Sequence, residues 1–201
     1  MTGRRKTAAE LMAELNSDPE YLARKAEKEE ARQKLLAQRA KEAAPVVAAL
    51  RTAGIEVQSI WDLSDGGKAY PEAIPVLFEQ LKYDYPDHVR EGILRALATP
   101  DARGRWDELV GIFEYNTANL SPEIRYVAAL ALSGAADETV LDDVIRLAQD
   151  KRLGFDRVPL LLALVRSKTP KAKMVLLELR DDPDLGKEIK KMRRLERHQK
   201  S

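Results

Sequence analysis

Three arginines at regular intervals are the side chains of this sequence whose spacing most suggests a chemical site. Each begins the same phrase, an arginine followed by five residues and then Ala-Leu, at Arg90, Arg125 and Arg157. The copies start 35 and then 32 residues apart. A guanidinium is a permanent cation with five donors, so a row of them could bind an anionic ligand. The same fork could instead bond a carboxylate or carbonyl of a neighbouring turn.

A second group of cations lies near the carboxyl end, in the segment KEIKKMRRLERHQK. Ile189, Met192 and Leu195 recur there at helical spacing, and five cations surround them: Lys190, Lys191, Arg193, Arg194 and Arg197. A basic amphipathic helix can contact RNA, an anionic lipid surface or an acidic partner. It can also be a capping helix whose apolar side covers the body of the protein. The capping role is the one we favour.

Residue types that carry catalysis or hold metals are scarce. The chain has no cysteine and two histidines, His88 and His198. Disulfides, thiolate catalysis and Cys-based zinc sites are therefore excluded. No Gly-rich phosphate loop, GxSxG or HExxH occurs. We expect a protein that is not an enzyme and that binds no cofactor and no metal.

The elements that position the arginines are predicted to be helices. Ala, Leu, Glu, Lys and Arg dominate the composition, and long alternating Val/Ile/Thr runs are absent. A repeat of 32 to 35 residues is typical of stacked helical pairs. We expect pairs at about 71–82 with 86–98, 104–116 with 122–133, 138–149 with 155–167, and 170–181 with 184–198.

The residues before the repeats follow another pattern. We predict an N-terminal helical extension over 1–54, with a long charged helix at about 19–44 and a second helix at 45–53. Asp18 is the expected cap of the long helix, Pro45 kinks or ends it, and Gly54 ends the second. The connector then covers 55–70, the repeats 71–183, and a basic capping helix or tail 184–201.

The net charge of +1 conceals an uneven distribution. Residues 1–53 carry +3, residues 54–183 carry −6 and residues 184–201 carry +4. An acidic body argues against a nucleic-acid cradle there, because phosphate contacts need clustered Lys and Arg. The N-terminus lacks the apolar core of a signal peptide, and no stretch approaches the ~20 apolar residues of a membrane span. We expect a cytoplasmic protein without a membrane span.

Residues 71–103 resemble a HEAT repeat of the short-loop bacterial kind. Three features carry the resemblance: the PEAIPVL opening, the turn Pro86-Asp87 followed by Val89-Arg90, and the closing Ala96-Leu97. The second copy keeps the last two features, whereas the third has Asp156 in place of an apolar residue. The resemblance implies an all-α fold, a right-handed α-solenoid of about four HEAT-like helical pairs with the N-terminal helical extension.

The resemblance also assigns roles to single residues. Arg90, Arg125 and Arg157 would form a structural ladder that bonds an acid or carbonyl of the adjacent turn, with Asp101 and Asp137 as expected partners. The second helix of each pair would line a concave face. The candidate partner-binding residues on that face are His88, Glu91, Arg95 and Tyr126.

These expectations favour a protein–protein interaction scaffold or adaptor, such as an immunity or assembly factor, whose partner is another protein. The first alternative is a nucleic-acid-associated protein that uses the two basic ends. A less favoured alternative is an enzyme similar to HEAT-like DNA glycosylases, suggested by Trp106-Asp107. We expect Trp106 instead to pack against the preceding repeat.

Overall fold

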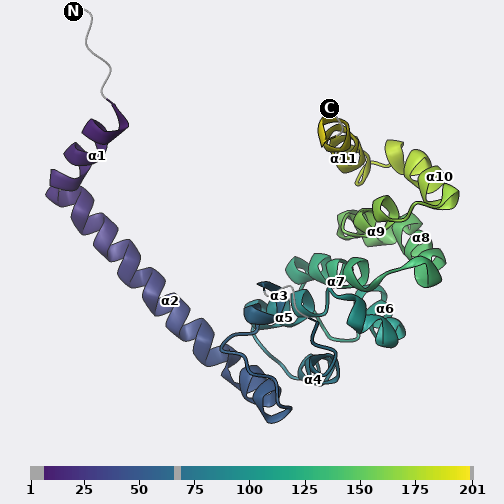
Figure 1. Ribbon diagram of the computed structural model, residues 1–201, viewed down its shortest axis with the longest axis horizontal. Coiled ribbons are helices and arrows are strands. Elements are labelled where there is room, and N and C mark those ends of the chain that lie inside the picture. The colour runs from purple at the N-terminus through teal and green to yellow at the C-terminus, as the bar shows by residue number, and fades with distance from the viewer. Residues whose placement is uncertain (1–6, 66–68, 200–201) are drawn as a thin grey trace, which may run out of the picture. The chain divides into compact units, whose positions relative to one another are not determined.

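Every regular element that the structure describes is a helix (Figure 1). The computed structural model describes residues 7–65 and 69–199. The predicted all-α class is confirmed for these residues. By its internal contacts the chain divides into two compact units, Met1–Glu42 and Ala43–Ser201.

The first unit contains α1 (Ala8–Ser17) and most of α2 (Pro19–Thr52). Asp18 separates the two helices, and its Oδ1 accepts the N–H groups of Glu20 at 2.9 Å and Tyr21 at 3.4 Å, as a helix cap does. From residue 16 to residue 41 every residue except Tyr21 is exposed. This part of α2 therefore owes its helicity to good helix formers and to local pairs such as Lys34–Glu30, not to a core.

Pro45 does not divide α2, so the predicted break between helices 19–44 and 45–53 is wrong. The helix continues through Pro45 to Thr52. Proline inside a helix removes a backbone hydrogen bond and clashes with the preceding turn, at a cost of about 3 kcal/mol, but Val46, Val47 and Leu50 beyond it are buried. Their burial offsets that loss. The helix ends where predicted, because Gly54 donates to the Arg51 carbonyl at 2.9 Å with a φ of 83°.

The expected connector contains a short helix, α3 (Trp61–Asp65). The Asp62 carboxylate accepts the N–H groups of Gln58 and Ser59, at 2.8 and 2.9 Å. Helix α3 packs against α5, where Gly92 leaves room beside Ile60 and Trp61. The Trp61 side chain remains 40% exposed.

The rest of the second unit alternates helices with short turns. Its helices are α4 (Ala73–Gln80), α5 (Asp87–Ala96), α6 (Trp106–Glu114), α7 (Pro122–Ala135), α8 (Leu141–Gln149), α9 (Leu160–Arg166), α10 (Pro170–Glu178) and α11 (Gly186–Gln199). Four 3₁₀ segments join them: η1 (Pro100–Arg105), η2 (Glu138–Val140), η3 (Lys151–Arg157) and η4 (Leu179–Asp181).

Helix α9 is shorter than the predicted helix 155–167. Residues Lys151–Arg157 form η3 instead, interrupted at Gly154 by a φ of 54° that a side chain would strain. Pro159 then lies directly before α9, where its missing N–H costs no hydrogen bond. The ladder position Arg157 therefore lies in a 3₁₀ turn, whereas Arg90 and Arg125 lie on α-helices.

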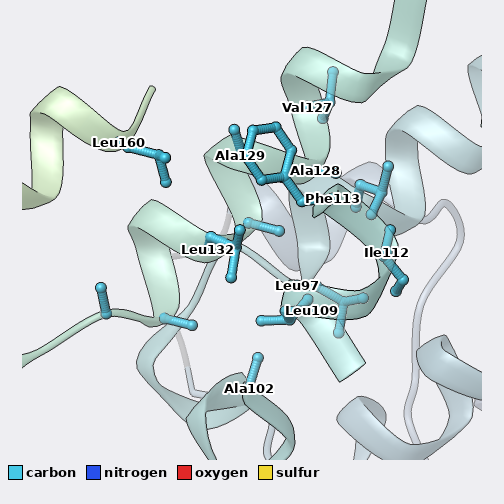
Figure 2. Close-up of a cluster of buried hydrophobic side chains, with 14 of the residues drawn as sticks. Leu97, Ala102, Leu109, Ile112, Phe113, Val127, Ala128, Ala129, Leu132 and Leu160 are labelled. Carbon is cyan, nitrogen blue, oxygen red and sulfur yellow. The ribbon is translucent and has the colours of Figure 1, made fainter. Parts of the chain in front are cut away.

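The helices contact one another in chain order. Helix α4 packs against α5, α6 against α7 and α8 against α9, and α7 also contacts both α5 and α9. Helix α10 packs against α8 and α9, and α11 packs against η4. A single buried apolar cluster runs through these contacts. Figure 2 shows its central part, where Leu97, Phe113, Leu132 and Leu160 meet from four helices or helix ends.

The C-terminal part of α7 passes directly against the backbone that follows α5. A Cβ added to Gly134 would lie 2.3 Å from the carbonyl carbon of Ala98. Real Cβ atoms do not approach that closely, and the obstacle is backbone, which cannot rotate away. Glycine at position 134 therefore permits the close packing of α5 and α7.

We expect Gly134→Ala to lower the free energy of unfolding by about 1–3 kcal/mol, the usual cost of forcing extra atoms into a packed core. Urea denaturation followed by circular dichroism measures the change. The matched control is Gly104→Ala, because nothing lies within 4 Å of a Cβ at position 104. If both variants are as stable as the wild type, the close approach at Gly134 is contradicted.

Candidate functional site

Arg90 is a buried cation that joins two loops. Its Nη1 donates to the carbonyl oxygens of Ala118 and Asn119, at 2.9 and 2.8 Å, in the loop between α6 and α7. Its Nη2 donates to the Tyr83 carbonyl at 3.1 Å and to Asp84 Oδ1 at 3.2 Å, in the loop between α4 and α5. The residue is 5% exposed. Arg90 therefore ties its own pair of helices to the next.

Arg157 makes the corresponding connection further along the chain, with carboxylates as acceptors. It is fully buried. It donates to the Ala148 carbonyl at 3.0 Å and the Gly154 carbonyl at 2.8 Å, within its own pair. Its Nη2 lies 3.1 Å from Asp182 Oδ1 and 3.1 Å from Asp184 Oδ2, in the loop after α10. Two carboxylates thus hold one buried guanidinium.

The Asp182 carboxylate is held in its charged form. Its burial alone would raise its pKa, but the N–H groups of Asp184 and Leu185 and the Arg157 guanidinium together lower the pKa below the usual value. The charged form is the one that binds Arg157. Folding and ionisation of Asp182 therefore favour each other.

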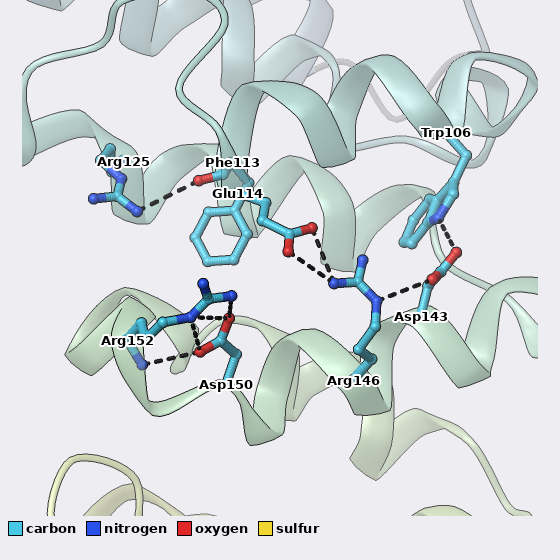
Figure 3. Close-up of polar contacts among 8 residues, drawn as sticks. All are labelled: Trp106, Phe113, Glu114, Arg125, Asp143, Arg146, Asp150 and Arg152. Carbon is cyan, nitrogen blue, oxygen red and sulfur yellow. Dashed lines mark hydrogen bonds and ion pairs between the residues drawn. The ribbon is translucent and has the colours of Figure 1, made fainter.

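Arg125 occupies the middle position and is bound more loosely. Its Nη2 is 3.5 Å from the Phe113 carbonyl (Figure 3), and its Nε is 3.9 Å from Asp156 Oδ2. The Arg125 side chain is 28% exposed, against 7% for Arg90 and 0% for Arg157. Burial raises the pKa of Asp156, although Arg125 opposes the rise. The middle connection is therefore the weakest of the three.

The expected ladder partners were wrong. Asp101 accepts the backbone N–H of Tyr70 at 3.3 Å, and Asp137 forms an ion pair with Arg103 at 2.7 Å. The arginines instead reach the loop inside the following pair, not the turn between pairs. The Nη groups of Arg90 and Arg157 donate to these loops, so the two side chains offer little to an external ligand.

The predicted partner-binding residues are divided between two helices. On α5, Glu91 and Arg95 form an ion pair at 2.9 Å, and His88 lies partly buried in the first turn. On α7, Tyr126 stacks against Phe155 of η3, with ring centroids 5.9 Å apart and an angle of 18° between the rings. Glu91 and Arg95 therefore neutralise each other on α5, whereas Tyr126 contacts Phe155, which was not among the predicted site residues.

Phe155 could have been found by aligning the repeats on their arginines. It lies two residues before Arg157, as His88 lies two before Arg90. By the same alignment Leu162 takes the position of Arg95. At these two aligned positions the side chains are therefore polar on α5, where they are His88 and Arg95, and apolar on η3 and α9, where they are Phe155 and Leu162.

Three apolar side chains, those of Tyr126, Phe155 and Leu162, are exposed on elements that contact one another. Tyr126 is 36% exposed, Phe155 is 56% exposed and Leu162 is 44% exposed. They lie on α7, η3 and α9, and α7 contacts both of the others. We call these three residues the apolar strip. Exposed aromatic side chains that stack, as Tyr126 and Phe155 do, are typical of a protein-binding surface.

Trp106 is a structural residue that connects α6 to α8 (Figure 3). It is 6% exposed, and its Nε1 donates to Asp143 Oδ2 at 3.1 Å. Arg146 extends the connection, since it bonds Glu114 at 2.9 Å and Asp143 at 3.4 Å. Trp106 therefore bonds Asp143 of the following pair. The sequence predicted packing against the preceding repeat and did not predict this bond.

The C-terminal cations are only partly within the described side chains. Lys190 and Lys191 are exposed, and Lys191 lies 3.5 Å from Glu188. Ile189 is buried and Met192 is partly buried on the same helix. The side chains of Arg193, Arg194 and Arg197 lie outside the described residues.

Searches for metal sites, membrane spans and known relatives add no assignment. Within residues 7–65 and 69–199, no three His, Cys, Asp or Glu side chains gather as metal ligands. No helix in those ranges is both long and apolar enough to cross a bilayer. No family model, curated protein or solved structure matches the chain.

We expect Arg157→Met to lower the free energy of unfolding by about 3–5 kcal/mol, because Asp182 and Asp184 would lose their buried counterion. Chemical denaturation measures the loss. Arg152→Met is the matched control, since Arg152 pairs with Asp150 but is 82% exposed. An exposed ion pair contributes about 0–1 kcal/mol. Equal losses in the two variants would show that Arg157 has no special role.

The lowered pKa of Asp182 gives stability a defined dependence on pH. Its contribution is complete above the unfolded-state pKa of about 3.9 and is lost as pH falls through the lower folded-state value. We expect Asp182→Asn to be less stable than the wild type at neutral pH and to lose less stability between about pH 4 and pH 2. Denaturation curves across that range test this. Asp181→Asn, at an exposed neighbouring carboxylate, should retain the wild-type slope.

Proposed function

We propose that this protein is a non-enzymatic interaction module built as a short right-handed α-solenoid of HEAT-like helical pairs. Two observations support this architecture. The helices pack in chain order, with α7 between α5 and α9. Arg90 and Arg157 each bond their own pair and the loop of the next one, and Arg125 lies within ion-pair distance of that loop. A stack of this kind presents its second helices as one extended surface.

The partner in this proposal is another protein, and the apolar strip is its docking surface. The observation that carries the proposal is the exposed stacked pair of Tyr126 and Phe155. Tyrosine is enriched among the residues that dominate binding energy. Leu162 enlarges the same surface, whereas the paired Glu91 and Arg95 on α5 provide a polar border.

The alternatives have less support. The glycosylase alternative needs Trp106 to stack on a base, but this ring is buried and bonded to Asp143. The nucleic-acid alternative has its best support on α2, where Lys25, Lys28 and Arg32 line a shallow groove beside Tyr21. Arg32 is already paired with Glu29 there, at 3.5 Å. An adaptor role that ends in binding a protein is therefore the function we propose.

A photo-crosslinking amino acid at position 155 tests the docking surface. We expect it to capture a specific partner in cells, whereas the same group at position 174, 62% exposed on α10, should not. Phe155→Ala should then weaken binding of the purified partner by about tenfold or more, the cost of losing one aromatic anchor. Leu177→Ala, at another exposed residue of α10, is the control. Equal capture at positions 155 and 174 would overturn the proposal.

A further inference from the structure

A hollow of about 240 Å³, lined by five apolar and two polar residues, lies between α9, α10 and α11. Leu164 and Ile189 line it and are buried. Val165, Leu176 and Met192 also line it but are only partly buried. A cavity of about 150 Å³ with an apolar lining already holds benzene. This hollow therefore has room for a bulky apolar side chain.

Two polar residues, Ser167 and Lys173, complete the lining. Ser167 Oγ bonds Glu138 at 3.2 Å and Thr169 at 3.0 Å. Within the described part of the chain, Lys173 Nζ has no carboxylate within ion-pair distance. Lys171, two residues away on the same helix, does pair with Asp142. Among the described side chains, the Lys173 ammonium group is therefore available to a ligand beside the hollow.

The surrounding sequence is strongly basic. Residues 166–201 contain twelve Lys and Arg and six Asp and Glu, a net charge of +6, although the whole chain carries only +1. Lys168 and Lys190 are exposed in this region. Charge complementarity favours an acidic partner here, because like-charged segments are repelled and opposite ones are attracted.

We propose that this hollow binds an acidic segment of a partner protein that inserts one bulky apolar side chain between α9, α10 and α11. Lys173 Nζ binds a carboxylate of the segment next to that side chain. This proposal rests on the proposed interaction function but uses a surface separate from the apolar strip. It adds the chemistry of the partner, a segment that combines acidic and large apolar residues.

A short fluorescein-labelled peptide of glutamates and leucines with one central tryptophan is the probe. We expect it to bind the full-length protein and to lose at least about tenfold in affinity when its glutamates become glutamines or its tryptophan becomes alanine. Methyl NMR of the methionines locates the site. Met192, which lines the hollow, should shift on binding, whereas Met174, which does not line it, should not.

Paired variants separate the two parts of the site. Val165→Trp should fill the hollow and abolish binding, whereas Leu177→Trp, outside the hollow, should not. Lys173→Glu should weaken binding by about tenfold. Lys187→Glu changes the net charge of the protein by the same amount as Lys173→Glu. At 100° per residue, Lys187 lies on the opposite face of α11 from Ile189 and Met192, so its substitution should weaken binding less. Circular dichroism confirms that each variant remains folded.

Several results would overturn the inference. They are absence of peptide binding, equal binding of the glutamine peptide, equal effects of Lys173→Glu and Lys187→Glu, or a shift of Met174 in place of Met192. Stronger binding of single-stranded RNA at Met192 would assign the site to nucleic acid. If Phe155→Ala loses its partner while the peptide does not bind, only this inference fails. If neither surface binds anything, the proposed function fails as well.

Discussion

A guanidinium placed between consecutive loops is the interaction on which the second unit depends most. A buried arginine is tolerated only where its donors find acceptors, because an uncompensated buried charge is strongly destabilising. Both Nη groups of Arg90 meet this need with three carbonyls and one carboxylate, although its buried Nε has no acceptor among the described residues. Arg157 meets it with two carbonyls and two carboxylates. Half of those acceptors belong to the next pair of helices. The requirement to satisfy one side chain therefore fixes where the next pair lies.

The apolar packing agrees with this arrangement but is less specific. Leu97, Phe113, Leu132 and Leu160 could interdigitate in several registers, since the hydrophobic effect has no direction. Gly134 removes some of that freedom, because only a residue without a side chain lets α7 pass Ala98 so closely. Hydrogen bonds from the arginines remove more. The surfaces proposed for binding lie where these constraints leave large apolar side chains in contact with water.

The sequence was sufficient for the helices and for the arginine spacing, because both depend on local patterns. It was insufficient at Pro45, where burial of Val46, Val47 and Leu50 outweighs the local preference for a break. The arginine partners were missed for a different reason. Asp101 and Asp137 follow the arginine-bearing helices closely in the sequence and were therefore expected as partners. A long side chain near the start of a helix reaches instead the loop of the next pair.

The binding surface was predicted only in part. Tyr126 was predicted from its place on the second helix of its pair. Phe155 was expected to begin a helix over 155–167, but it lies in η3, and the helix itself begins at Leu160. Its pairing with Tyr126 depends on how η3 contacts α7, a tertiary relation that no spacing within one repeat reveals. The hollow beside Lys173 depends in the same way on three helices meeting.

The arginine contacts are unequal along the second unit. Arg125 has the longest contacts, 3.5 and 3.9 Å, and it spans the junction between α6–α7 and α8–α9. Trp106 and Arg146 bridge the same junction through Asp143 and Glu114. Tyr126 and Phe155 come from opposite sides of the same junction. A partner that contacts both rings would bridge the two pairs of helices, so that binding at this surface would also stabilise their packing.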